Sequence, residues 1–199
     1  MSDKDLDQSK RNFLVAATST LGGVAGAAVA VPFVGSMWPS ERAKAAGAPV
    51  QADISKLAPG EMQIVEWRGK PVWVIRRTNE MLDGIKKNDP LVSDPKSDVP
   101  QQPDYATNEF RSQKPEIAVI VGVCTHLGCS PQFKPATMKS EMGDAWQGGF
   151  YCPCHGSKFD FAGRVFKGSP APINLQVPPY TFVSDNTLII GEDKEHKGT

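Results

Sequence analysis

The stretch FYCPCHGS, residues 150–157, places two cysteines and a histidine within four consecutive positions, at Cys152, Cys154 and His155. Thiolates and imidazoles bind metals, and paired cysteines also form disulfides or redox-active dithiols. One such cluster leaves all of these uses open. Its meaning depends on where the remaining cysteines and histidines of the chain lie.

A second cluster, CTHLGC at 124–129, accounts for most of the other soft ligands. The chain has four cysteines and three histidines. The second cluster contributes Cys124, His126 and Cys129, and only His196 lies outside both stretches. Two segments with three candidate ligands each, separated by residues 130–151, indicate two hairpin tips that meet over one metal centre.

A structural zinc site with two cysteines and two histidines is the simplest metal alternative, because zinc accepts thiolate and imidazole in tetrahedral sites. Zinc fingers, however, usually pair like with like along the chain. Here each segment offers one cysteine and one histidine, as Cys124-x-His126 and Cys152-x-x-His155. The interleaved pattern favours a binuclear centre, and a structural zinc module is kept as the alternative from a different class.

The two motifs together, CTHLGC followed by CPCHGS, resemble those of the Rieske iron-sulfur proteins of quinol-cytochrome c oxidoreductases, the bc1 complexes. The resemblance implies one Rieske-type [2Fe-2S] cluster. In that family pattern Cys124 and Cys152 would bind one iron, and His126 and His155 would bind the other.

The same resemblance implies roles for the remaining residues of the two motifs. Cys129 and Cys154 would form a disulfide that ties the two cluster loops together. His155 would hydrogen-bond the quinol and is the expected catalytic residue, with Leu127 on the same contact surface. Ser157 would donate its hydroxyl hydrogen to a bridging sulfide and stabilise the reduced cluster.

Mixed ligation has a physical consequence for the reaction. Neutral imidazoles leave a cluster less negative than thiolates do, and Rieske centres accordingly span roughly −150 to +300 mV, against about −400 mV for plant-type ferredoxins. Reduction also raises the affinity of a ligand histidine for a proton. A group that takes up one electron and one proton near neutral pH suits the oxidation of a hydroquinone.

Two positions depart from the family pattern. Phe159 stands where bc1 proteins often have a tyrosine that donates to a cysteine sulfur, so we expect a lower midpoint potential and keep menaquinol beside ubiquinol as a donor. Downstream, KGSPAP at 167–172 resembles the proline-rich loop that covers the cluster, with Ser169 where many members run from glycine straight into proline.

The N-terminal region predicts a membrane anchor. No charged residue occurs from Asn12 to Ser40, and a helix of about 20 residues spans a bilayer. The preceding SKRNFL, residues 9–14, resembles a twin-arginine export signal with Lys10 in place of the first arginine. A cleaved signal peptide is the alternative, since Ala43-Lys44-Ala45 offers a small-x-small site, but the apolar stretch exceeds a signal h-region.

The export signal and the implied disulfide predict a bacterial inner-membrane protein, crossing once, with its C-terminal domain in the oxidising periplasm. The expected organisation is a cytoplasmic N-terminus (1–12), a transmembrane anchor (13–38), a flexible hinge (39–53) and a Rieske domain (54–199) whose cluster-binding part covers about 118–174.

Residue patterns in the C-terminal domain predict a mostly β fold, an antiparallel Rieske-type sheet domain. We expect a hairpin over 60–77 with its turn at Gly69-Lys70-Pro71, and strands over 116–124 and 148–152 that lead into the two motifs. Further strands are expected at 164–167 and 186–190, a short helix at Met81–Lys87, and a long loop at Asp89–Lys114.

The expected function is that of an electron-transfer subunit, which takes an electron from quinol and passes it to cytochrome c1. Its partners would be cytochrome b, cytochrome c1, quinol and the lipid bilayer, in a dimeric complex. A formal net charge of zero without a basic block argues against nucleic acid. The alternatives are the Rieske small subunit of an arsenite oxidase and, with the same ligand spacing, a Rieske ferredoxin or ring-dioxygenase component.

Overall fold

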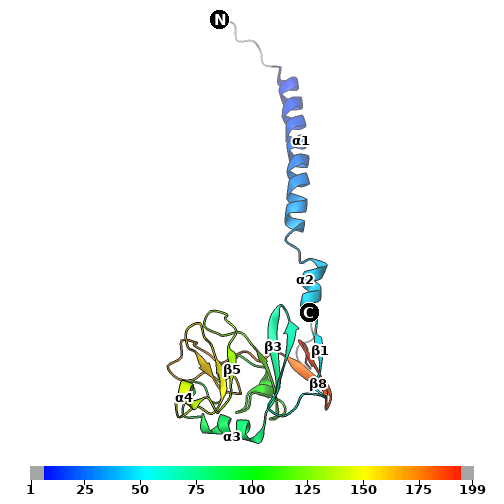
Figure 1. Ribbon diagram of the computed structural model, residues 1–199. Coiled ribbons are helices and arrows are strands. Elements are labelled where there is room, and N and C mark those ends of the chain that lie inside the picture. The colour runs from blue at the N-terminus through cyan, green and yellow to red at the C-terminus, as the bar shows by residue number, and fades with distance from the viewer. Residues whose placement is uncertain (1–6, 194–199) are drawn as a thin grey trace. The chain divides into compact units, whose positions relative to one another are not determined.

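The computed structural model describes residues 7–193, and its chain contacts divide into two units (Figure 1). The first unit ends at Ala45 and the second begins at Ala46. The first unit is helical, and the second contains all of the described strands, so the two are described separately.

The first unit is dominated by one long helix, α1 (Gln8–Gly35), of 28 residues. Asp7 caps it by accepting hydrogen bonds from the backbone N–H groups of Ser9 and Lys10. The helix is long and apolar enough to cross a membrane, and none of its residues is buried. The helix begins before residue 13, where the anchor was expected to start. Asp7 caps it at its first turn, so the helix includes the charged residues Lys10 and Arg11.

The segment expected to be a flexible hinge, residues 39–53, contains regular structure at both ends. A short helix, α2 (Glu41–Ala46), occupies its first part, and the strand β1 (Val50–Asp53) its last. The expected boundary after residue 53 is therefore wrong. Ala52 is buried, and β1 pairs with the strand β9 near the C-terminus, so these residues belong to the β domain.

The second unit contains three antiparallel sheets of three strands each, in the orders β1-β9-β8, β2-β3-β4 and β5-β6-β7. In Figure 1 the strand β3 lies between β5 on one side and β1 and β8 on the other. The remaining strands are β2 (Met62–Trp67), β3 (Lys70–Arg76), β4 (Ile117–Val121), β5 (Gln132–Lys134), β6 (Gly149–Tyr151), β7 (Lys158–Phe159), β8 (Tyr180–Ser184) and β9 (Thr187–Ile190).

The sheet β2-β3-β4 separates two hydrophobic cores. Successive residues of a strand point to opposite faces, so Val72 and Val74 of β3 enter one core while Trp73 and Ile75 enter the other. The first core is shared with β1, β8 and β9. The second contains Cys124 and Cys152. Because both faces of the sheet are buried, β3 and β4 read as almost continuous apolar runs.

The predicted hairpin is present, but its turn lies one residue earlier than expected. Trp67 pairs with Lys70, which leaves Arg68 and Gly69 as the two turn residues. Both have positive φ, 52° and 68°, as a type I′ turn requires. Lys70 and Pro71, expected in the turn, start strand β3.

The short helix and the long loop predicted after the hairpin are both present, and the helix begins two residues earlier than expected. The predicted helix is α3 (Asn79–Lys87), capped by Thr78, whose hydroxyl accepts from the N–H of Met81. The long loop includes a single 3-10 turn, η1 (Asp104–Ala106), and a further short helix, α4 (Lys139–Met142), lies between the two motifs.

The strand predicted at residues 164–167 is absent from the described structure. Val165 and Phe166 make only isolated bridges, to Phe159 and Val92. The backbone turns between Asp160 and Arg164 around a buried ion pair. After this turn, Val165 and Phe166 each pair at one position only.

Candidate metal centre

The two motifs form loops that close in the same way. The first follows β4, and the second connects β6 to β7. In the first loop the N–H of Cys124 donates to the carbonyl of Cys129, at 2.8 Å, and the N–H of Gly128 donates back to the carbonyl of Cys124. The second loop repeats this pattern from Cys152, whose N–H donates to the carbonyl of Ser157 at 2.8 Å.

A glycine closes each loop for a conformational reason. Gly128 and Gly156 stand four residues after the first cysteine of their motifs, with φ of 86° and 83°. Side chains other than hydrogen are disfavoured in this region. The repeated spacing of cysteine and glycine in the sequence therefore encodes two equivalent loops that present their side chains toward each other.

A disulfide joins the loops, between Cys129 and Cys154, the pair that the resemblance implied. The Sγ atom of Cys152 lies within 4.8 Å of both disulfide sulfurs. These three sulfurs lie close together, but Cys129 and Cys154 are bonded to each other and are not available as thiolate ligands.

The four predicted ligands lie in the structure as two neighbouring pairs, Cys124 with Cys152 and His126 with His155. Cys124 and Cys152 are free cysteines, each only 2% exposed. The imidazole rings of His126 and His155 lie edge to face, with their centroids 4.7 Å apart. His196, the remaining histidine, lies outside the described residues.

The Nδ1 atom of His126 supports a metal-binding role. It is buried and has no hydrogen-bond partner in the described structure. A buried polar nitrogen without a partner is costly unless another group takes its lone pair. Two free thiols and two imidazoles, one with such a nitrogen, have the donor chemistry that the predicted mixed-ligand cluster requires.

The electrostatics of the cysteines point in the same direction. Burial is the main cause that raises the pKa of the Cys124 thiol; the His126 N–H lowers this pKa, Cys152 raises it, and the Ser157 hydroxyl lowers it, with a net increase. Two adjacent buried thiolates are therefore unfavourable by themselves. A bound cation would compensate them, because metal ions bind cysteine in its deprotonated form.

Ser157 occupies a well-defined position beneath the loops. It is fully buried, and its Oγ accepts a hydrogen bond from the N–H of Ala171 at 3.0 Å. Ala171 lies in the proline-rich loop at 167–172. The hydroxyl of Thr125 donates at 2.7 Å to the carbonyl of Ile173, the residue after this loop, so the segment 167–173 is bonded to both motif loops.

The tip of the site is open, and its base is apolar. Leu127 is 71% exposed in the first loop, and His155 is exposed in the second. Phe159, where a tyrosine was noted as the commoner residue, is fully buried in the core that contains Cys124 and Cys152.

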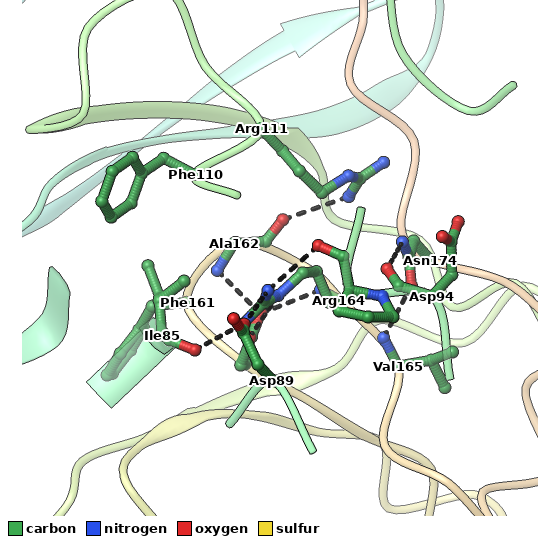
Figure 2. A network of polar contacts seen from close by, with 12 residues as sticks. Ile85, Asp89, Asp94, Phe110, Arg111, Phe161, Ala162, Arg164, Val165 and Asn174 are labelled. Carbon is green, nitrogen blue, oxygen red and sulfur yellow. Dashed lines mark hydrogen bonds and ion pairs between the residues drawn. The ribbon is translucent and has the colours of Figure 1, made fainter. Parts of the chain in front are cut away.

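A buried ion pair behind the site was not anticipated from the sequence. Arg164 and Asp160 are both fully buried, with Nε of Arg164 2.8 Å from Oδ2 of Asp160. Figure 2 shows the Arg164 guanidinium reaching the carbonyl of Ile85 and the carboxylate of Asp89, while Arg111 donates to the carbonyl of Ala162. Two opposite charges four residues apart in the otherwise apolar run DFAGRVF were the available signal.

Three hydrogen bonds that position the loops were also missed: those of Thr125 and Ala171, and one in which Oγ of Ser169 accepts from the N–H of Lys158. They join residues far apart in the chain, and a backbone N–H such as that of Ala171 leaves no trace in a sequence motif. The site therefore contains more of the chain than the two motifs.

Comparison with known proteins gives two family models and close relatives. Residues 1–40 match the model described as the "Ubiquitinol-cytochrome C reductase Fe-S subunit TAT signal", and residues 95–179 match the "Rieske [2Fe-2S] domain". The chain is 56% identical over 98% of its length to the ubiquinol-cytochrome c reductase iron-sulfur subunit of Allochromatium vinosum, covering 94% of that protein.

Two further similarities were found. The Rhodospirillum rubrum protein of the same name is 41% identical, with 93% of each chain covered. Among solved structures, a chain of "Hyperthermophilic respiratory Complex III" is 29% identical with a TM-score of 0.47, covering 87% of this chain and 98% of that chain.

Proposed function

The chain belongs to the family of Rieske iron-sulfur subunits of ubiquinol-cytochrome c reductases, and from this premise we propose how its residues transfer electrons. As a member it is a membrane-anchored electron-transfer subunit of a bc1 complex, with cytochrome b and cytochrome c1 as partner subunits and one Rieske [2Fe-2S] cluster. This membership favours the reductase over the arsenite oxidase, ferredoxin and zinc alternatives.

Cys124 and Cys152 hold one iron in this proposal, and His126 and His155 hold the other. The orphaned Nδ1 of His126 carries the assignment, together with the two free buried thiols beside it. When bound, the cluster supplies a one-electron acceptor whose potential is raised by imidazole ligation. Cys129 and Cys154 are left to the disulfide that fixes the two loops relative to each other.

His155 is the residue that meets the quinol. It is exposed, whereas His126 is half-buried, so only His155 offers a ring edge freely to a second molecule. Its outer nitrogen would accept the quinol hydroxyl's hydrogen bond and then hold the proton released on oxidation. Leu127, exposed in the first loop, supplies an apolar contact for the quinol ring.

Ser157 adjusts the reduction potential of the cluster through its hydroxyl group. Because its Oγ already accepts from Ala171, the hydroxyl hydrogen is free to point elsewhere, and Cys124 is its neighbour. Donation toward the sulfur atoms would stabilise the more negative, reduced state.

The finer location is also proposed. A disulfide persists in an oxidising compartment, and export of a folded domain suits a site assembled before it crosses. Both observations support a periplasmic β domain, an uncleaved α1 crossing the bacterial inner membrane once, and a cytoplasmic N-terminus. The dimeric state of the complex and the identity of the quinol stay predictions of the family resemblance.

Chemical analysis of the purified full-length protein tests the ligand assignment. We expect iron and acid-labile sulfide in equal amounts, and the EPR signal of a reduced mixed-ligand cluster. His126→Ala should abolish that signal. The exposed Lys139→Ala, between the motifs, is the control and should retain it. Zinc without acid-labile sulfide, or an unchanged EPR signal in His126→Ala, would contradict the assignment.

A further inference from the structure

The proline-rich loop is bonded to the second motif loop by two hydrogen bonds of opposite direction. The N–H of Ala171 donates to Oγ of Ser157 at 3.0 Å. In return, Oγ of Ser169 accepts from the N–H of Lys158, the residue after Ser157, at 3.2 Å. Two consecutive residues of one loop are thus held by two nearby residues of the other.

The donor half of this arrangement depends on one backbone group. Pro170 and Pro172 flank Ala171 and have no N–H. Ala171 is therefore the only donor that the segment 170–172 can offer to Ser157. The direction of the Ala171 N–H depends on the position of the loop backbone. No side chain of the segment could donate in its place.

Ser169 determines that placement through a tight turn. Residues 166–169 form a β-turn, in which the N–H of Ser169 donates to the carbonyl of Phe166 at 3.2 Å and Gly168 has φ of 75°. The carbonyl of Lys158 accepts from the N–H of Phe166 at 3.0 Å. Lys158 therefore binds the first residue of the turn by its carbonyl and the last by its N–H, the latter through the Ser169 hydroxyl.

We propose that Ser169 is a positioning residue that sets the orientation of the Ser157 hydroxyl and thereby raises the midpoint potential of the cluster. This inference rests on the proposed donation from Ser157 toward the cluster sulfurs. Without the Ser169 oxygen, Lys158 loses the acceptor of its N–H and the loop loses its anchor two residues before Ala171. The Ala171 N–H then no longer fixes Ser157, and the Ser157 hydroxyl hydrogen samples other directions.

A double-mutant cycle on the full-length protein with its cluster tests the proposal. Redox titrations would compare wild type, Ser169→Ala, Ser157→Ala and the double variant. One hydrogen bond changes an equilibrium constant by about two- to tenfold, and a tenfold change is about 59 mV for one electron. We expect Ser169→Ala to lower the midpoint within this range, and the double variant to match Ser157→Ala.

Two further variants separate orientation from general loosening of the loop. Ser169→Thr keeps the hydroxyl oxygen and should keep the wild-type midpoint. Ser93→Ala removes a hydroxyl from an exposed serine outside the site and should leave the potential unchanged. A Thr variant that falls as far as the Ala variant would show that the hydrogen bond is not the cause.

The outcomes distinguish this inference from the proposal beneath it. An unchanged midpoint in Ser157→Ala would overturn the role of Ser157, and with it the role of Ser169. A lowered midpoint in Ser157→Ala with an unchanged one in Ser169→Ala would overturn the Ser169 inference alone. The Ser169 inference would also be overturned if Ser169→Ala changed the midpoint equally in the wild-type and the Ser157→Ala background.

Discussion

At the scale of single residues, the site depends on a few buried polar atoms, of which some have a hydrogen-bond partner in the described structure and some have none. Within residues 7–193, Nδ1 of His126 is buried and has no hydrogen-bond partner, whereas Oγ of Ser157 is buried and has one. The first suits a metal ligand and the second suits a fixed donor. The aromatic ring at position 159 adds an apolar floor without any donor.

Replacing Phe159 with tyrosine is expected to raise the midpoint potential. Phe159 shares a core with Cys124 and Cys152, so the added hydroxyl would be buried close to ligand sulfurs and would gain most by donating to one of them. The expected size is that of one hydrogen bond, about two- to tenfold in the reduction equilibrium.

Redox titration of the Phe159→Tyr protein checks this prediction. Phe182→Tyr is the matched control, because Phe182 packs against the other hydrophobic core and should leave the midpoint unchanged. If Phe159→Tyr had the same midpoint as the wild type, the residue at position 159 would not be what lowers the potential.

At the scale of elements, the turn that follows β7 connects the second motif to the proline-rich loop. Oδ1 of Asp160 accepts from the backbone N–H groups of Ala162 and Arg164, at 2.9 Å each, and Oδ2 accepts from the Arg164 side chain. One buried carboxylate therefore stabilises the turn with both of its oxygens.

Removing Arg164 should destabilise the fold strongly. In Arg164→Leu the fully buried Asp160 loses its ionic partner, and breaking a buried pair from one side costs about 3–5 kcal/mol. Asp89 is half exposed and contributes less. Thermal unfolding of the detergent-solubilised protein, followed by visible absorbance of the cluster, measures the effect.

The exposed ion pair between Lys114 and Asp185 provides the control for this experiment. Asp185 is almost fully exposed, so Asp185→Asn should cost less than about 1 kcal/mol. A comparable loss of stability in both variants would mean that burial of the Arg164 pair is not what stabilises the turn.

At the scale of the whole molecule, the chain crosses between sheets to bring distant segments to one place. The site draws on the first motif after β4, the second after β6, and the loop before Asn174, with the disulfide spanning 25 residues of sequence. Its three loops are therefore held by tertiary bonds and not by their order along the chain.

Removing the disulfide should weaken the site as a whole. A cross-link over a loop of this length stabilises by roughly 3–4 kcal/mol in the chain-entropy model. We expect Cys129→Ala/Cys154→Ala to lose its cluster faster in the presence of an iron chelator, as the EPR signal decays. Decay at the wild-type rate would contradict a holding role for the bridge.

Much of the fold and site could be predicted from the sequence, because the decisive signals were local. The ligand spacing, the glycine four residues after each cysteine and the uncharged stretch before Ser40 each lie within one segment. The turn at Arg68-Gly69 and strand β1 were misjudged, since both are defined by their pairing partners in the sheet.

The sequence by itself determined that two short motifs carry the cysteines and histidines available as ligands, and that a helix long enough for a membrane precedes a β domain; the family resemblance of the motifs predicted the ligand set and the disulfide. Only the tertiary structure decided how that chemistry is supported. It brings Asp160 to Arg164, Ala171 to Ser157 and Ser169 to Lys158. The physical reason is that ligand identity and turn geometry are properties of neighbouring residues, whereas burial and hydrogen-bond partners depend on segments that meet only when the chain has folded.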